Sequence, residues 1–314
     1  MTTVDLAASA AVPKALEAPK KARPKVSETW WRHLVGVIAC FIALFPVWFV
    51  ASAAFNADQS VSGTSYLPTH FTLNNFGQLL HGHVKDQSSG STVDAPFLRW
   101  IGNTMLVAIV VAVSQVIIAA LAAYAFSRFR FRGRRLGMLA LLLIQMFPAL
   151  LTIVAIYLIV LNVGGIFPVF GFNTLAALIL VYLGGSMGVN TWLMKGFFDS
   201  IPKELDESAR VDGATAAQIF WGVVLPLALP VLAVVGLWSF IFTLNEYAIA
   251  SAILQTTHQL TLPVGMYGFI SSEYGQRWGP FAAGALISAI PATLLFAWLQ
   301  RYIVSGLSQG AVKG

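Results

Sequence analysis

The stretch that decides the fold reads Asp199-Ser-Ile-Pro-Lys-Glu-Leu-Asp-Glu-Ser-Ala-Arg-Val-Asp-Gly-Ala-Thr-Ala-Ala-Gln-Ile-Phe-Trp-Gly-Val-Val-Leu-Pro226. It is a densely charged island with long apolar runs on both sides. A charged side chain at the middle of a bilayer costs at least ~3 kcal/mol. The island is therefore expected to lie in water, and the apolar runs beside it to cross a membrane.

The local pattern of this island predicts a helix, a turn and a second helix. Ser200 can cap the first helix, and Pro202 is tolerated in a first turn because its missing N–H loses no bond there. Gly213 permits a turn with positive φ. Thr215 with Gln218 three residues later is a capping-box pattern, which predicts that a second helix starts at this point.

The same stretch resembles the EAA loop of permeases in ATP-binding-cassette importers. Glu207-Ser-Ala209, then Gly213, then Val223-Val-Leu-Pro226 keep the spacing of that loop, with Ser208 and Val223 as small departures. The resemblance implies a short coupling helix that fits into a cleft on an ATPase subunit. The residues that it assigns to this contact are Glu204, Glu207, Ser208, Ala209, Asp212 and Gly213.

Composition places the chain among polytopic membrane proteins. The 314 residues are 57% hydrophobic and 10% charged, and the mean hydropathy is +0.75. Soluble domains carry about 25% charged residues. The predicted fold class is an all-α polytopic membrane protein, with six transmembrane helices and a cytosolic coupling helix between spans 4 and 5.

The chain divides into a tail, a membrane domain and a second tail. Residues 1–29 are expected to form a disordered basic tail, residues 30–304 a six-span permease domain containing the loop 199–226, and residues 305–314 a C-terminal tail. The predicted spans are 33–55, 100–126, 136–161, 174–194, 220–243 and 280–304, each about the length that crosses a bilayer.

Charge distribution orients these spans. All but three of the 19 Lys and Arg residues fall on one side of the proposed membrane, and the exceptions are Lys85, Arg99 and Arg277. Because cytosolic loops are rich in Lys and Arg, we expect both termini in the cytosol of a bacterial cell, with the chain in the cytoplasmic membrane. The cluster 128–135 interleaves Arg with Phe, which could suggest RNA, but a topological role fits the sequence better and no nucleic-acid partner is expected.

The sequence contains no catalytic or metal-binding constellation. His81 and His83 lie in a glycine-rich segment without a third ligand nearby, and no phosphate-binding Gly-x-x-x-x-Gly-Lys-Ser/Thr loop is present. We therefore expect no enzymatic activity, no metal and no cofactor on this chain. ATP and magnesium would be bound by a separate ATPase.

Polar residues in or near the spans are candidates for the transport pathway, although many such residues only join helices. The end of the fifth span is rich in aromatic and polar side chains, which could stack on sugar rings and hydrogen-bond hydroxyls. An aromatic belt at the outer interface is the alternative. The candidates there are Trp238, Phe240, Asn245, Glu246 and Tyr247.

The C-terminal sequence adds a second resemblance. Gly306-Leu307 and Gly310-Ala-Val-Lys-Gly314 are similar to the end of the shorter permease subunit in maltose and maltodextrin importers, as is Leu262-Pro-Val-Gly-Met266. In that family the tail reaches between the ATPase subunits. The resemblance therefore implies that Gln309, Gly310 and Lys313 contact the ATPase.

Together these features predict a permease subunit of an ATP-driven bacterial carbohydrate importer. The resemblance implies a second permease subunit, an ATPase dimer, an extracytoplasmic sugar-binding protein and the lipid bilayer as partners. Maltose or maltodextrin is the favoured cargo, while trehalose and other α-glucosides stay open. The alternatives are an ion-coupled secondary transporter, which would need coupling acids within its spans, and a membrane-embedded enzyme, which would need paired carboxylates or a histidine cluster.

Overall fold

A computed structural model of the chain describes residues 26–57, 67, 70–85, 92–185, 187–271 and 277–311. The chain divides into two compact units, residues 1–47 and residues 48–314. The described part of the first unit is the beginning of a single apolar helix. The second unit holds the other helices and both candidate sites.

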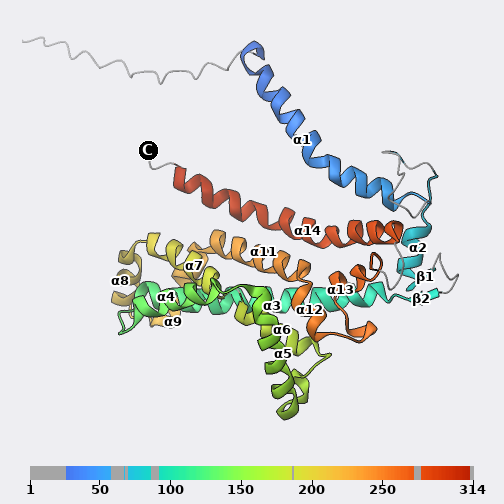
Figure 1. The fold of residues 1–314 in the computed structure, drawn as a ribbon. Coiled ribbons are helices and arrows are strands. Elements are labelled where there is room, and N and C mark those ends of the chain that lie inside the picture. The colour runs from blue at the N-terminus through green and yellow to red at the C-terminus, as the bar shows by residue number, and fades with distance from the viewer. Residues whose placement is uncertain are drawn as a thin grey trace, which may run out of the picture. The chain divides into compact units, whose positions relative to one another are not determined.

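The described secondary structure is almost entirely helical (Figure 1). The α-helices are α1 (Val26–Ala54), α2 (Asn74–Leu80), α3 (Phe97–Arg128), α4 (Arg134–Gln145), α5 (Ala149–Ile166), α6 (Leu175–Gly185), α7 (Met187–Ser200), α8 (Lys203–Val211), α9 (Ala216–Ile219), α10 (Leu225–Leu227), α11 (Leu229–Asn245), α12 (Ala248–Ile253), α13 (Leu262–Tyr267) and α14 (Trp278–Ala311). Short 3-10 turns stand at Pro168–Phe170 and Thr257–Gln259, and a π-helical turn at Phe220–Val224.

One small hairpin departs from the predicted all-helical pattern. β1 (His83–Lys85) pairs antiparallel with β2 (Thr92–Asp94), and Val84 lies opposite Val93. It falls in the polar segment between the first two predicted spans, where the turn-rich sequence carries no strand pattern.

Helix α3 is the central element of the second unit. It packs against α7 and α11, and α11 packs in turn against α14 (Figure 1). The buried face of α3 carries many alanines, including Ala108, Ala119 and Ala123. Small side chains let helix backbones approach closely, which is how membrane helices gain packing energy without a hydrophobic driving force between them.

The long apolar helices confirm the polytopic helical architecture. Trp30–Ala54, Phe97–Arg128 and Trp278–Ile303 are each long and apolar enough to cross a membrane, and two bent helix pairs raise this number to five in the described part of the chain. The shorter apolar helix Leu151–Ile166 lies within the predicted third span and the loop that follows it.

Two of the predicted spans are bent. The sequence offers four prolines as potential kink sites, namely Pro148, Pro226, Pro230 and Pro291. The fourth predicted span is α6 followed by α7, bent by 48°, and the fifth is the 216–227 helical segment followed by α11, bent by 79°. Pro226 and Pro230 flank the sharper bend at Ala228. A proline removes a backbone donor and clashes with the preceding turn, so a helix breaks or bends there.

A third break lies within the predicted third span. α4 ends at Gln145, and α5 begins after Pro148, whose ψ of 121° is not helical. The helix is therefore interrupted at Pro148, one of the potential kink sites. Pro291 behaves differently, because it remains inside the continuous helix α14.

The predicted tails also need adjustment. α1 begins at Val26, so residues 26–29 are helical rather than part of an irregular tail. α14 continues to Ala311, well beyond the predicted end of the sixth span. Residues 1–25 of the predicted tail 1–29 and residues 312–314 of the predicted tail 305–314 lie outside the described residues.

Candidate functional site

The first candidate site is α8, whose acidic residues divide between two environments. Asp206 is buried, whereas Glu204 and Glu207 are exposed. The Asp206 carboxylate forms an ion pair with Nε of Arg128 at 2.8 Å, and the two side chains are 4% and 2% exposed. α8 is therefore attached to the end of α3 through Asp206, and its other acids remain available to a partner.

The end of α3 also forms two hydrogen bonds with residues that directly precede α8. Nη2 of Arg128 donates to the carbonyl of Ile201 at 3.1 Å, in the link between α7 and α8. Oγ of Ser127 donates to Oδ1 of Asp199 at 2.7 Å, at the end of α7. The charge pattern predicts a topological role for the cluster 128–135, and the structure adds a specific structural contact for its first arginine.

Ala209, the last residue of the Glu207-Ser-Ala209 triplet, faces the protein interior. Ala209 is half-buried and packs against the core that contains Phe198, Ile201 and Phe220, whereas Ser208 is exposed. A larger side chain at position 209 would push α8 away from this core, because packed interiors leave no spare volume. The departure from the family pattern at Ser208 therefore falls on a position with room for it.

The turn after α8 has the conformation that the sequence predicted. Gly213 has φ of 83°, in the left-handed region where a side chain is strained. Thr215 and Gln218 form the predicted capping box, with the backbone N–H of Thr215 donating to Oε1 of Gln218 at 2.8 Å. The predicted cap at Ser200 is wrong: Ser200 ends α7, its Oγ donates to the carbonyl of Phe197, and Pro202 precedes α8 without a side-chain cap.

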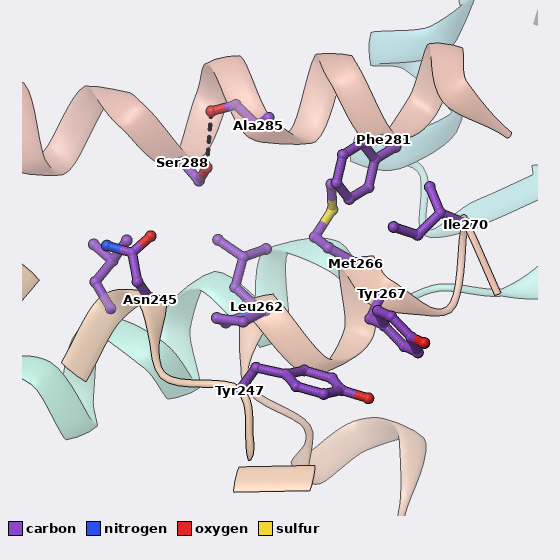
Figure 2. A pocket seen from close by; sticks show the side chains of 11 residues that line it. Asn245, Tyr247, Leu262, Met266, Tyr267, Ile270, Phe281, Ala285 and Ser288 are labelled. Carbon is purple, nitrogen blue, oxygen red and sulfur yellow. Dashed lines mark hydrogen bonds between the residues drawn. The ribbon is translucent and has the colours of Figure 1, made fainter. Parts of the chain in front are cut away.

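The second candidate site is a cavity of about 300 Å³ between α11, α13 and α14 (Figure 2). Tyr247 and Tyr267 lie side by side in it, with ring centroids 4.8 Å apart, and Ser288 of α14 lies across from them. The remaining lining residues are Leu244, Asn245, Leu262, Pro263, Met266, Ile270, Phe281 and Ala285. Aromatic faces beside a few polar groups are typical of a site for a small polar ligand with apolar faces, such as a sugar.

The predicted pathway residues separate into three groups. Asn245 and Tyr247 line this cavity. Trp238, Asn245 and Glu246 line a second hollow of about 280 Å³. Phe240 is buried against Ala108 of α3 and lines neither. Sequence reasoning did not select Tyr267 or Ser288, although Tyr267 directly follows the quoted Leu262–Met266 segment.

Glu246 also has a structural role at the start of α12. Its Oε1 accepts from the backbone N–H of Ile249 at 2.8 Å and its Oε2 from that of Ala250 at 3.0 Å, so it satisfies donors in the first turn of α12. The hydroxyl of Tyr182 on α6 donates to the same carboxylate. A carboxylate at a helix N-terminus is stabilising, so these contacts account for the charge at this position without a sugar.

The other polar residues of the spans join helices. Nε2 of Gln115 on α3 donates to the carbonyl of Tyr182 at 2.8 Å, and Nδ2 of Asn190 on α7 donates to Gln115 and to Oγ of Ser239, each at 3.2 Å. Nδ2 of Asn103 donates to the carbonyl of Leu260 at 2.9 Å. These hydrogen bonds fix α3 against its neighbours, as the alternative interpretation of the sequence held.

The predicted ATPase contact at the C-terminus is only partly described. Gln309 and Gly310 lie in the last turns of α14, and Lys313 lies outside the described residues. Among the described residues, no group of three or more His, Cys, Asp and Glu could hold a metal ion.

Comparison with known proteins gives a consistent result. Residues 115–309 match the family described as "Binding-protein-dependent transport system inner membrane component". The chain is 36% identical over 282 residues to the galactooligosaccharides transport system permease GanQ of Bacillus subtilis, covering 90% of this chain and 94% of that protein. It is 37% identical over 304 residues to the maltose/maltodextrin transport system permease MalG of Yersinia pestis, covering 96% and 97%.

A solved structure has the same fold. A chain of a bacterial ABC transporter involved in the import of the acidic polysaccharide alginate superposes with a TM-score of 0.69 and 24% identity, covering 91% of this chain and 99% of that one.

Proposed function

The chain belongs to the binding-protein-dependent transport system inner membrane components, and from this premise we propose that it is the permease subunit of an ATP-driven carbohydrate importer coupled through α8. The observation that carries this proposal is the division of acids on α8, with Asp206 buried against Arg128 while Glu207 is exposed. A short helix fixed on one side and charged on the other is suited to transmit force from a docked partner.

The proposed mechanism follows the contacts outward from α8. Closure of an ATPase dimer would push on the exposed face of α8, and the ion pair between Asp206 and Arg128 would carry that push to the end of α3. Because α3 packs along α7 and α11, the bent helices would move with it as rigid segments. Such a motion can switch a central site between the two sides of the membrane, as alternating access requires.

The proposed partners are those that a single permease subunit lacks. They are a second permease subunit, an ATPase dimer that binds ATP and magnesium, and an extracytoplasmic sugar-binding protein. Membership of a permease family favours this assignment over an ion-coupled transporter or a membrane-embedded enzyme. We also propose that α8 and both termini face the cytosol, because the Lys and Arg residues are concentrated on that side.

The proposed cargo is an oligosaccharide, with maltose or maltodextrin as the first choice. Relatives of similar identity are named for maltodextrin and for galactooligosaccharides, so the sugar has to be tested directly. The cavity with Tyr247, Tyr267 and Asn245 offers two aromatic rings and an amide for a sugar ring and its hydroxyls.

Coupling is tested by changing the exposed side of α8 and its turn. Glu207→Lys reverses the charge offered to the ATPase, and Gly213→Pro cannot adopt the positive φ that the turn uses. Both variants should abolish sugar uptake and remain in the membrane. Asp94→Lys is the matched control, because it reverses an exposed acid in β2, which precedes the start of α3 and so lies away from Arg128 at its end, and it should leave uptake unchanged. Normal uptake by Glu207→Lys and Gly213→Pro would refute the coupling mechanism.

The cargo is tested by the ATPase activity of the reconstituted complex. Binding protein loaded with maltose should stimulate hydrolysis strongly. Stimulation by a galactooligosaccharide or trehalose, but not by maltose, would keep the mechanism and replace the sugar. Uptake that follows an ion gradient instead of ATP would refute the assignment itself.

A further inference from the structure

A basic groove lies between the beginning of α4 and the middle of α7. It is a cavity of about 560 Å³ lined by Arg134, Arg135, Met138, Leu139, Trp192 and Lys195. Neither the proposed coupling contact nor the sugar cavity uses any of these residues. The groove combines three cations with apolar and aromatic side chains in one hollow.

The packing of the two helices explains why the groove opens where it does. α4 and α7 touch at Gly188, where an added Cβ would collide with the carbonyl oxygen of Leu141. Gln145 secures this crossing, since its Nε2 donates to the carbonyl of Gly185 and its Oε1 accepts from the backbone N–H of Val189. The groove is lined by residues of both helices on the side of this crossing toward the beginning of α4.

The groove keeps a net positive charge. Lys195 forms an ion pair with Asp199, and no acid lines the groove itself. Among the described residues, Arg134 and Arg135 make no ion pair. Asp199 also interacts electrostatically with Arg134, at a distance beyond an ion pair, so one carboxylate offsets part of the charge of three cations. Guanidinium groups bind phosphate with two parallel hydrogen bonds.

The apolar part of the groove continues into surface that suits lipid. Leu139 and Trp192 are 55% exposed each, and Leu143 on the next turn of α4 is 64% exposed. Tryptophan is enriched where membrane proteins meet the headgroup layer, and basic pockets between membrane helices on the cytoplasmic side bind anionic headgroups.

We propose that this groove is a binding site for an anionic phospholipid. The phosphate would lie between Arg134 and Arg135, and the glycerol and first methylenes would lie along Met138, Leu139 and Trp192. The proposal uses the orientation argued above, with α8 on the side of the anionic leaflet, but it does not require the coupling mechanism to be correct.

The first test measures lipid retained by the intact importer complex, using native mass spectrometry after delipidation and addition of phosphatidylglycerol. The double variant Arg134→Gln/Arg135→Gln should bind it about thirty-fold more weakly, because each cation near an anionic surface contributes a factor of about five. The matched control is Arg130→Gln/Arg132→Gln, which removes the same charge from the same segment outside the groove and should bind normally.

Two probes define the ligand. Phosphatidylcholine should be retained much less than phosphatidylglycerol, and inorganic phosphate at millimolar concentration should not displace the lipid. Equal retention of both lipids, equal loss in both double variants, or displacement by inorganic phosphate would each overturn the proposal.

A second test distinguishes lipid from a protein partner. A photoreactive benzoyl-phenylalanine placed at Leu139 in the assembled complex should crosslink to phospholipid. Crosslinking to the second permease or to the ATPase instead would show that the groove is a subunit contact, which would also overturn the proposal.

Discussion

The end of α3 that carries α8 and the region around the aromatic cavity are built in different ways. Around α8, charged groups meet at short range: Asp206 and Arg128 are paired and almost fully buried. Around the cavity, Tyr247, Tyr267 and Ser288 come from three separate segments and present rings and hydroxyls rather than charges. The α8 region is thus joined to α3 by a buried ion pair, which suits the force transmission that we propose for it, whereas the cavity offers uncharged aromatic and polar groups, which suit the sugar that we propose for it.

Of the changes that test this comparison, the largest effect is expected for the buried ion pair between Asp206 and Arg128. Asp206→Asn or Arg128→Gln leaves one charge buried without its partner, which should cost about 3–5 kcal/mol of stability. We expect a large fall in the melting temperature of the purified complex and loss of stimulated ATPase activity. Glu204→Gln, which neutralises an exposed acid on the same helix, should leave the melting temperature unchanged. Equal melting temperatures of Asp206→Asn and Glu204→Gln would show that the ion pair does not attach α8 to α3.

The next effect concerns the two small residues of the EAA-like triplet. Ala209→Leu places a larger side chain against the packed core beneath α8, and overpacking of this kind costs about 1–3 kcal/mol. The variant should melt earlier and couple poorly. Ser208→Leu makes the same kind of change at an exposed position and should melt like the unmodified protein. If both variants have the same melting temperature, Ala209 is not the residue through which α8 packs against the core.

A smaller effect is expected at the cavity. Tyr247→Ala removes one of the two neighbouring rings and should raise the sugar concentration needed for half-maximal transport about tenfold, by analogy with the contribution of aromatic contacts to binding. Tyr247→Phe keeps the ring and should transport nearly normally. An unchanged sugar dependence in Tyr247→Ala would remove the cavity from the transport pathway.

The smallest effect is expected at Glu246, which should affect stability and not, like the cavity residues, the sugar dependence of transport. Glu246→Gln loses the charge at the start of α12 but keeps one acceptor oxygen, so we expect a loss of about 1 kcal/mol in stability. The sugar dependence of transport should stay unchanged. A clear change in sugar dependence at unchanged stability would instead mean that Glu246 contacts the sugar.

Much of the α8 region could be predicted from sequence because its elements are local. The positive φ at Gly213 and the capping box of Thr215 with Gln218 depend on residues within a few positions of one another. Burial could not be read in the same way. Asp206 and Glu207 are adjacent acids, and only the approach of Arg128, far away in the chain, buries one and leaves the other exposed.

The positions of the helix bends could likewise not be predicted from the sequence alone. Pro148, Pro226 and Pro291 carry the same signal in the sequence, yet the helix ends or bends near the first two and continues through the third. A proline always removes one hydrogen bond, but the surrounding packing decides whether the helix absorbs the loss or breaks.

The sequence by itself determined that this chain crosses a membrane several times, which side of each span carries the charges, and where a short charged helix interrupts the apolar runs. These properties follow from hydropathy, charge and spacing, which every residue carries regardless of its neighbours in space. Only the tertiary structure decided that Arg128 holds Asp206, that Phe240 is core while Tyr247 meets Tyr267 in a cavity, and that Arg134 and Arg135 share a groove with Lys195. These contacts join residues distant in the chain, and they form only once the helices have packed.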